Sequence, residues 1–185
     1  MINSLISYIL GIIKITLYKI LNFNRIYIDR NPKINYTTNF YINKNSKVRL
    51  GKSFRSRNNI SIYCCDGGKI NIQDNVFIND GCIISCRNKI NIGSNCMLGN
   101  NVSIYDNDHD YKNDLHKYKT SEIEIGNNVW IGCNSVILKG SKIGNNSVIA
   151  AGTIVKGEIP DNTMVYTKRE NCINKFKEIY DVRKS

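Results

Sequence analysis

Aliphatic side chains recur every six residues along the second half of the chain. Between residues 125 and 155, six consecutive positions of one frame are aliphatic: Ile125, Ile131, Ile137, Ile143, Ile149 and Val155. An amphipathic helix would repeat near 3.6 residues, and a half-buried strand would alternate with period 2. The pattern therefore predicts a longer repeating unit of six residues.

The six-residue frame extends upstream to about residue 48. It includes Leu50 and Ile62, resumes at Ile72 after CCDGG, and slips by two residues at RNKIN before Ile92. Gly or Asn often follows the aliphatic position, where a corner needs unusual backbone angles. We expect a mainly β fold in which each unit is one short strand and three units form a triangular coil of a parallel β-solenoid. A β-sandwich would instead require turns at 8–12-residue spacing.

The N-terminal segment, MINSLISYILGIIKITLYKILN, has a helical period instead. A polar stripe runs along one side of the helical wheel, and aliphatic residues occupy the rest. The stripe consists of Asn3, Ser7, Gly11, Lys14 and Tyr18. The uncharged run is too short to span a bilayer, and no signal-peptide cleavage site follows it. We expect an amphipathic helix that lies in a membrane interface or packs on protein, and both alternatives stay open.

The length of 185 residues suits one sizeable core with short appendages. We expect the N-terminal helix in residues 1–23 and the solenoid in residues 24–166. A loop should be extruded from the solenoid over residues 105–122. The tail, residues 167–185, has the pattern of a short helix that would cover the last coil.

Positive charge is concentrated in the N-terminal third. Residues 1–57 hold 11 Lys and Arg against a single acid, Asp29, whereas the remainder holds 15 bases and 14 acids. Such a segment attracts lipid headgroups, phosphorylated ligands or acidic glycans. No nucleic-acid-binding motif accompanies the charge, so nucleic acid is not an expected partner. Residues 1–57 are instead candidates for peripheral contact with a membrane.

The seven cysteines are odd in number and lack C-x-x-C spacing. We interpret them as reduced thiols of a cytoplasmic protein, because no cleavable signal is evident. Free cysteine packs as a small apolar residue, so we expect core filler rather than a metal site.

The segment 105–120 is the one long polar interruption of the repeat. It contains both histidines, His109 and His116, and four carboxylates. Loops extruded from a rigid scaffold often carry sites. We take His109 as the candidate general base, with His116 in reserve. A carboxylate or a carbonyl on the other ring nitrogen would orient the imidazole. The candidate carboxylates are Asp106, Asp108 and Asp110.

Three features together resemble the hexapeptide-repeat acyltransferases, whose fold is a left-handed parallel β-helix. They are the hexapeptides from Leu50 onward, the loop NDHDYKND, and the run IEIGNNVWIGCNSVILKGSKIGNNSVIAAGTIVKGEIPDN. They cover about two-thirds of the chain. The more specific part is the loop histidine followed 21 residues later by the tryptophan of V-W-I-G. The resemblance is strongest to sugar O-acetyltransferases and to those of capsule and lipopolysaccharide synthesis.

This resemblance implies direct transfer of an acetyl group from acetyl-CoA to a sugar hydroxyl, with no metal and with His109 as general base. The acceptor would be a unit or precursor of a surface polysaccharide. The family works as a homotrimer with each active site between neighbouring subunits. We therefore expect a cytoplasmic trimer, and the basic N-terminal third favours the inner face of the membrane.

The resemblance also implies roles for individual residues. Trp130, Asn79 and Tyr105 would contact the acceptor, and Trp130 would also border the pantetheine arm. The remaining expected cofactor contacts are Cys133, Ala151, Lys156, Lys168 and Arg169. The last two substitute for the family's usual G-N-P-A-containing segment, which VYTKRE replaces here.

Two alternatives remain open. An N-acetyltransferase acting on an amino-sugar nucleotide would usually begin with a small βαβ domain. A non-catalytic, membrane-tethered solenoid would need neither the histidine loop nor V-W-I-G. A γ-type carbonic anhydrase is excluded because its zinc site needs three histidines and the chain has two.

Overall fold

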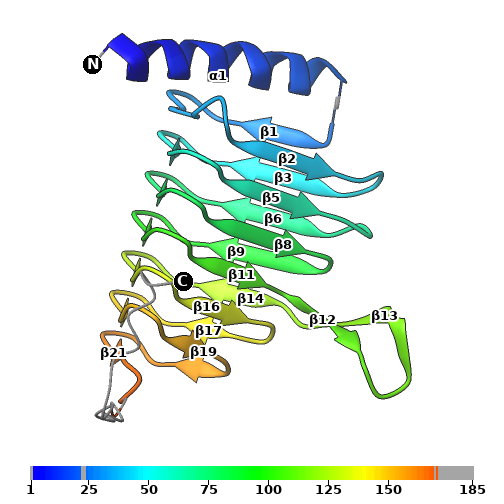
Figure 1. Cartoon of the computed structure of the whole chain (residues 1–185), viewed down its shortest axis with the longest axis vertical. Coiled ribbons are helices and arrows are strands. Elements are labelled where there is room, and N and C mark those ends of the chain that lie inside the picture. The colour runs from blue at the N-terminus through cyan, green and yellow to red at the C-terminus, as the bar shows by residue number, and fades with distance from the viewer. Residues whose placement is uncertain (1, 22–23, 169, 171–185) are drawn as a thin grey trace, which may run out of the picture.

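The computed structural model describes residues 2–21, 24–168 and 170, and it shows a β-solenoid with one helix across its N-terminal end (Figure 1). The helix, α1, covers Ile2–Leu21. Three parallel sheets form the sides of the solenoid, and consecutive strands pass from one sheet to the next. The mainly β fold with an N-terminal helix is therefore confirmed.

The sheets are named faces A, B and C. Face A contains β1 (Ile26–Ile28), β3 (Lys47–Leu50), β6 (Lys69–Ile72), β9 (Lys89–Ile92), β14 (Ile123–Ile125), β17 (Lys142–Ile143) and β20 (Glu158–Ile159). Face B contains β4 (Arg55–Ser56), β7 (Phe77–Ile78), β10 (Met97–Leu98), β15 (Trp130–Ile131), β18 (Val148–Ile149) and β21 (Met164–Val165). Face C contains β2 (Asn39–Ile42), β5 (Ser61–Cys64), β8 (Ile83–Cys86), β11 (Ser103–Tyr105), β16 (Val136–Leu138) and β19 (Ile154–Val155).

The repeating aliphatic side chains form columns inside the prism. On face C, Ile62, Ile84 and Ile104 are partners in adjacent strands, and none of the three has any exposed surface. Each coil buries its aliphatic residues against those of the coils above and below, so one coil alone would leave them exposed. The six-residue frame thus corresponds to the inward positions of the strands.

Cysteines fill small gaps in this core, as predicted. Cys64, Cys82, Cys86 and Cys96 are free thiols with at most 1 % exposure. Burial raises the pKa of the Cys82 thiol to about 11, so this thiol stays protonated near neutral pH. Cys133 differs because it is exposed.

Asparagines line the corner between faces A and B. Each takes a positive φ of 56–60°, a conformation that asparagine adopts more readily than most L-residues. The amide Nδ2 of each residue donates to the Oδ1 of the next, over 2.9–3.1 Å. The members of this asparagine ladder are Asn75, Asn95, Asn128, Asn146 and Asn162. The ladder links successive coils outside the core.

The helix α1 packs on its own solenoid through its polar stripe. Lys14 Nζ donates to the backbone carbonyls of Tyr36 and Thr38, at 2.9 Å each, and to Asn39 Oδ1 at 2.8 Å. The Tyr18 hydroxyl donates to the carbonyl of Phe40. Partial burial of Lys14 lowers its pKa. These donors satisfy carbonyls on and beside the edge strand of the first coil, which would otherwise be open to pairing.

The contact between α1 and the coil is close. Ser7, Gly11 and Ile15 are buried, and a Cβ atom on Gly11 would lie 1.9 Å from the Ile34 carbonyl oxygen. Only glycine fits there without displacing the helix. Of the two alternatives for this segment, the structure shows packing on the chain's own first coil, with much of the aliphatic surface turned outward.

Within the part of the chain that the structure describes, α1 does not have the length and apolarity needed to cross a bilayer. The predicted C-terminal helix lies almost wholly outside the described residues, so it stays a prediction. The division into parts at residues 23 and 166 and the left-handed winding likewise stay predictions.

The chain leaves face C after β11 to form an antiparallel hairpin, β12 (Asn107–Asp110) and β13 (Asp114–Thr120), before returning at β14 (Figure 1). Asp106 closes the base of this hairpin. Its buried carboxylate accepts hydrogen bonds from the backbone N–H groups of Arg87 and Asn88, both at 2.8 Å. Its carbonyl accepts the N–H of Ser121 at 2.9 Å. The exit and the return of the chain are thereby held to the coil of β8 and β9.

The asparagine ladder predicts a graded response at Asn128. Valine would lose both ladder hydrogen bonds and strain the positive φ, whereas glycine would lose the bonds without the strain. We expect a loss of unfolding free energy of about 2–3 kcal/mol for Asn128→Val and about 1 kcal/mol for Asn128→Gly. Urea unfolding followed by circular dichroism measures both. Equal losses would show that the positive φ does not matter.

The hairpin base predicts that Asp106→Ala destabilises the protein by about 2 kcal/mol, because it leaves the backbone N–H groups of Arg87 and Asn88 without their acceptor. Hydrogen exchange should increase over residues 83–92. Asp108→Ala is the matched control. It removes the partly exposed ion pair with Lys139 and should change stability by less than about 1 kcal/mol. Similar exchange in the two variants would contradict the role assigned to Asp106.

Candidate active site

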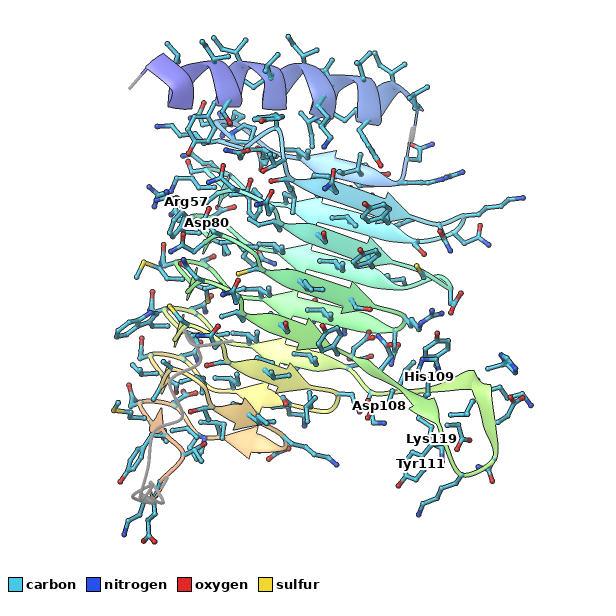
Figure 2. All side chains as sticks on the ribbon, in the orientation of Figure 1. Arg57, Asp80, Asp108, His109, Tyr111 and Lys119 are labelled. Carbon is cyan, nitrogen blue, oxygen red and sulfur yellow. The ribbon has the colours of Figure 1, made fainter. Side chains whose placement is uncertain are left out.

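His109 projects from the hairpin in an orientation set by the backbone. It lies on β12 opposite Tyr118 of β13, and its Nδ1 is 2.6 Å from the carbonyl oxygen of Leu115 (Figure 2). A carbonyl oxygen can only accept a hydrogen bond, so Nδ1 carries the proton. In the neutral ring, Nε2 then has a free lone pair that can accept a proton. The side chain is exposed, so a substrate can reach it.

An aromatic and cationic stack holds the imidazole from the side. The ring centroids of His109 and Tyr118 are 4.5 Å apart. The guanidinium carbon of Arg87 lies 3.5 Å from the Tyr118 ring centroid, and the guanidinium also pairs with Asp66. Because Asp106 binds the backbone N–H of Arg87, the hairpin base and the histidine support belong to one network.

Arg87 and Tyr118 were not predicted as site residues. One available signal was the two-residue slip of the repeat at RNKIN, which begins with Arg87. Tyr118 carried no signal because its role depends on cross-strand pairing within a loop that the repeat does not constrain.

A shallow, open depression of about 400 Å³ lies beside the histidine, where the hairpin meets face C. It brings together three of the predicted site residues, His109, Tyr105 and Asp108. Its lining is Ser85, Arg87, Tyr105, Asn107, Asp108, His109, Tyr118 and Leu138. The lining is mixed in polarity and can accommodate a polar ligand.

The predicted orienting carboxylates have other partners. The two oxygens of Asp106 bind backbone N–H groups, and Asp108 pairs with Lys139 at 2.9 Å (Figure 2 labels Asp108). The Leu115 carbonyl, and not a carboxylate, lies at hydrogen-bonding distance from Nδ1. A carbonyl, the other possibility raised from the sequence, is therefore the group that orients the ring.

Asp110 makes its side-chain contacts within the hairpin. Its carboxylate accepts the side-chain amide of Asn113 at 2.8 Å and pairs with Lys119 at 2.9 Å. The hydrogen bond from Asn113, together with Lys119, lowers the pKa of Asp110, so the carboxylate is ionised at neutral pH. His116, the reserve base, lies on β13, where its backbone N–H donates to Asp114. Neither residue lines the depression beside His109.

A second group of predicted residues lies on face B and at the corner between faces B and C. Trp130 points outward from β15 and is 53 % exposed. Cys133 and Ala151 follow β15 and β18 at that corner, where the carbonyl of Cys133 accepts the backbone N–H of Gly152. The hairpin with His109 leaves at the corner between faces C and A. Figure 1 shows it projecting on the side away from β21 of face B.

Asn79 lies at the same B–C corner, next to a polar network. Its Oδ1 accepts the backbone N–H of Asp80 at 3.0 Å. Although burial opposes ionisation, hydrogen bonds from Asn58 and the neighbouring Arg57 keep the pKa of Asp80 below its usual value. Arg57 lies 3.4 Å from the carboxylate (Figure 2). Within a single copy of the chain, Asn79 and Trp130 therefore lie apart from His109.

The candidate basic contacts for CoA lie on the last coils. Lys156 is exposed between β19 and β20, at the corner from which the hairpin also emerges. Lys168 is exposed beyond β21. Arg169 lies outside the described residues. Among the residues that the structure describes, no three His, Cys, Asp or Glu side chains form a metal-binding group.

The sequence matches other proteins in two ways. Residues 122–157 match the family model "Bacterial transferase hexapeptide (six repeats)". WbbJ of Escherichia coli (strain K12), named for O-acetyl transfer in lipopolysaccharide biosynthesis, is 30% identical over 139 residues, which cover 69% of this chain and 71% of WbbJ. The galactoside O-acetyltransferase of Escherichia coli (strain K12) is 38% identical over 106 residues, which cover 56% of this chain and 52% of that enzyme. The match thus spans only about half of this second relative.

Solved structures share the fold at lower identity. AntD, an N-acyltransferase from Bacillus cereus in complex with dTDP and 3-hydroxybutyryl-CoA, superposes with a TM-score of 0.65 at 16% identity, covering 78% of this chain and 80% of AntD. The acetyltransferase VCA0836 from Vibrio cholerae superposes with a TM-score of 0.51 at 21% identity, covering 83% of this chain and 74% of that one. At these identities the likeness shows the fold alone. With the repeat, the solenoid and the extended match to WbbJ taken together, the chain belongs to the family of hexapeptide-repeat acetyltransferases.

Proposed function

We propose that the protein is an acetyl-CoA-dependent O-acetyltransferase that modifies a sugar hydroxyl of a surface-polysaccharide unit or precursor. The observation that carries the proposal is the exposed imidazole of His109, with Nδ1 bound to the Leu115 carbonyl and Nε2 available as a base. The names of the relatives from Escherichia coli support hydroxyl acceptors.

In this mechanism, Nε2 of His109 removes the proton of the acceptor hydroxyl while the oxygen attacks the thioester carbonyl. The resulting tetrahedral oxyanion collapses, the carbon–sulfur bond breaks, and the imidazolium gives its proton to the departing CoA thiolate. The Leu115 carbonyl stabilises the transient positive charge because it accepts a hydrogen bond from Nδ1–H throughout the reaction. Tyr118 and Arg87 limit rotation of the ring.

The separation of the predicted site residues supports a site shared between copies in a homotrimer. Face B presents an outward column of mostly apolar side chains in register: Phe77, Met97, Trp130, Val148 and Met164. Face A instead presents charged residues such as Lys47, Lys69 and Glu124. Face B is thus better suited than face A to contact between copies, which would place His109 of one copy near Trp130 of the next.

Acetyl-CoA would then lie along the edge of the last coils. Gly132 there has room for no side chain, because a Cβ atom would lie 2.5 Å from the Ala151 nitrogen. Small residues such as Ala151 leave the backbone accessible to the pantetheine arm. Lys156, Lys168 and Arg169 are the proposed partners of the phosphates. The AntD structure holds 3-hydroxybutyryl-CoA together with dTDP, so an acyl-CoA donor is compatible with the fold.

A second candidate is N-acylation of an amino-sugar nucleotide, because AntD, which shares the fold, is an N-acyltransferase that has also been solved with dTDP-4-amino-4,6-dideoxyglucose and coenzyme A. The same base could deprotonate an ammonium group before attack on the thioester. Turnover on hydroxyl acceptors supports the first proposal, and turnover confined to amine acceptors supports the second. We place either reaction in the cytoplasm, where acetyl-CoA is available.

The mechanism predicts that His109→Ala lowers kcat by about two to four orders of magnitude, because a general base contributes that much. Thioester loss from acetyl-CoA, measured with a panel of sugars and amino sugars, gives the rate. His116→Ala is the matched control on the same hairpin and should retain activity within about twofold. A His109→Ala enzyme as active as the wild type would remove this residue from the mechanism.

The shared site predicts complementation between two impaired variants. We expect His109→Ala and Trp130→Ala to be weakly active alone. Co-expressed in equal amounts, they should recover about a quarter of wild-type activity, since random mixing pairs a native His109 with a native Trp130 in that fraction of all interfaces. Co-expression of His109→Ala with the double variant is the control and should recover nothing. No recovery in the first mixture would contradict a shared site.

A further inference from the structure

The outward surface of α1 is an apolar face that no other described part of the chain covers. We call it the outer face of α1. Its side chains are between 49% and 68% exposed: Leu5, Ile9, Ile12, Ile13, Leu17 and Ile20. Figure 2 shows side chains rising from the side of the helix that points away from the solenoid. Contiguous apolar surface of this extent on a folded protein usually marks an interaction site.

Specific contacts on the opposite side fix the direction of this face. Lys14 makes three hydrogen bonds to the first coil, and Gly11 lets the helix backbone approach Ile34. Turning the helix so that its aliphatic residues faced the coil would break these bonds. It would also leave the edge carbonyls of the coil without donors. The apolar face is therefore directed outward by the packing of α1.

Exposed basic side chains lie on the first coils of the solenoid, beneath this face. Exposed members within the first coils are Arg30, Lys33, Lys44, Lys47, Arg49 and Lys52. We call them the basic belt. Lys47 lies in register with Lys69 on the next strand, so two like charges are direct neighbours. Such a pair is unfavourable unless an anion lies close to it. Asp29 is the only acidic residue among residues 1–57.

We propose that the outer face of α1 lies in the interface of an anionic lipid bilayer, with the basic belt at the level of the headgroups. An interfacial helix combines buried aliphatic side chains with nearby Lys and Arg, and both are present here. A second copy of the chain is a poorer occupant of the face. Face-to-face contact between two α1 helices would bring two basic belts together, and their charges repel.

This docking would orient the whole solenoid. The helix lies across the end of the prism, so the long axis of the solenoid would stand roughly along the membrane normal (Figure 1). On face C, β11 is the third strand beyond β2. At about 4.8 Å per strand, the base of the hairpin lies about 14 Å further from the membrane than β2. The hairpin then projects from the side of the solenoid (Figure 1).

Vesicle flotation of the full chain tests the proposal without any measurement of acetyl transfer. The probes are vesicles of phosphatidylcholine alone and of phosphatidylcholine with phosphatidylglycerol. We expect the wild type to float with the anionic vesicles, to float less with the neutral ones, and to dissociate as salt is added. Ile13→Glu with Ile20→Glu should weaken partitioning at least tenfold, because two aliphatic side chains no longer enter the interface.

Tyr111→Glu with Tyr166→Glu is the matched control. It adds the same charge at two exposed aromatic positions away from α1, one on the hairpin and one beyond β21, and it should float like the wild type. Both double variants alter exposed side chains, so unchanged thermal unfolding checks that the fold is intact. Flotation of the α1 variant equal to that of the wild type would overturn the proposal. The proposal would also be overturned if the wild type failed to float but formed larger species in sedimentation, and the α1 variant did not form them. The outer face of α1 would then join copies of the chain.

Discussion

The register between successive coils is the constraint on which the rest of the structure depends. Parallel pairing places Ile62, Ile84 and Ile104 directly over one another, and a shift by one residue would turn these side chains outward. Outside the core, the asparagine ladder repeats the same register at the A–B corner. This stacking sets the position of the exposed features. The outward column of face B, the charged face A and the exit of the hairpin are all fixed by which strands pair.

The candidate site forms where this regularity is broken. The carboxylate of Asp106 accepts hydrogen bonds from two backbone N–H groups at the hairpin base. The chain can therefore leave the coil without disturbing the adjacent strands. The hairpin is then free of the repeat, and cross-strand pairing places Tyr118 beside His109. The same rigid prism keeps His109 and Trp130 at different edges. A site that uses both side chains therefore needs a second copy, which links the proposed chemistry to assembly.

The repeat was readable from the sequence because each inward position needs an aliphatic residue and each corner needs Asn or Gly. The loop and its histidine were also predictable, since they interrupt that pattern. The partner of His109 was not predictable in detail, because the Leu115 carbonyl is a backbone group that any residue supplies. The orientation of α1 was even harder to predict from the sequence. An amphipathic pattern usually buries its apolar side, but here the end of the solenoid offers backbone carbonyls, and Lys14 and Tyr18 match them.

A structure determined with CoA and an acceptor sugar would test the central claim most directly, namely that one copy's hairpin and another copy's face B form the catalytic site. The account predicts a trimer in which the CoA sulfur lies beside Trp130 of one copy. The acceptor hydroxyl should lie within about 3 Å of His109 Nε2 of its neighbour. A CoA sulfur bound far from every His109, or a complete site within a single copy, would contradict it.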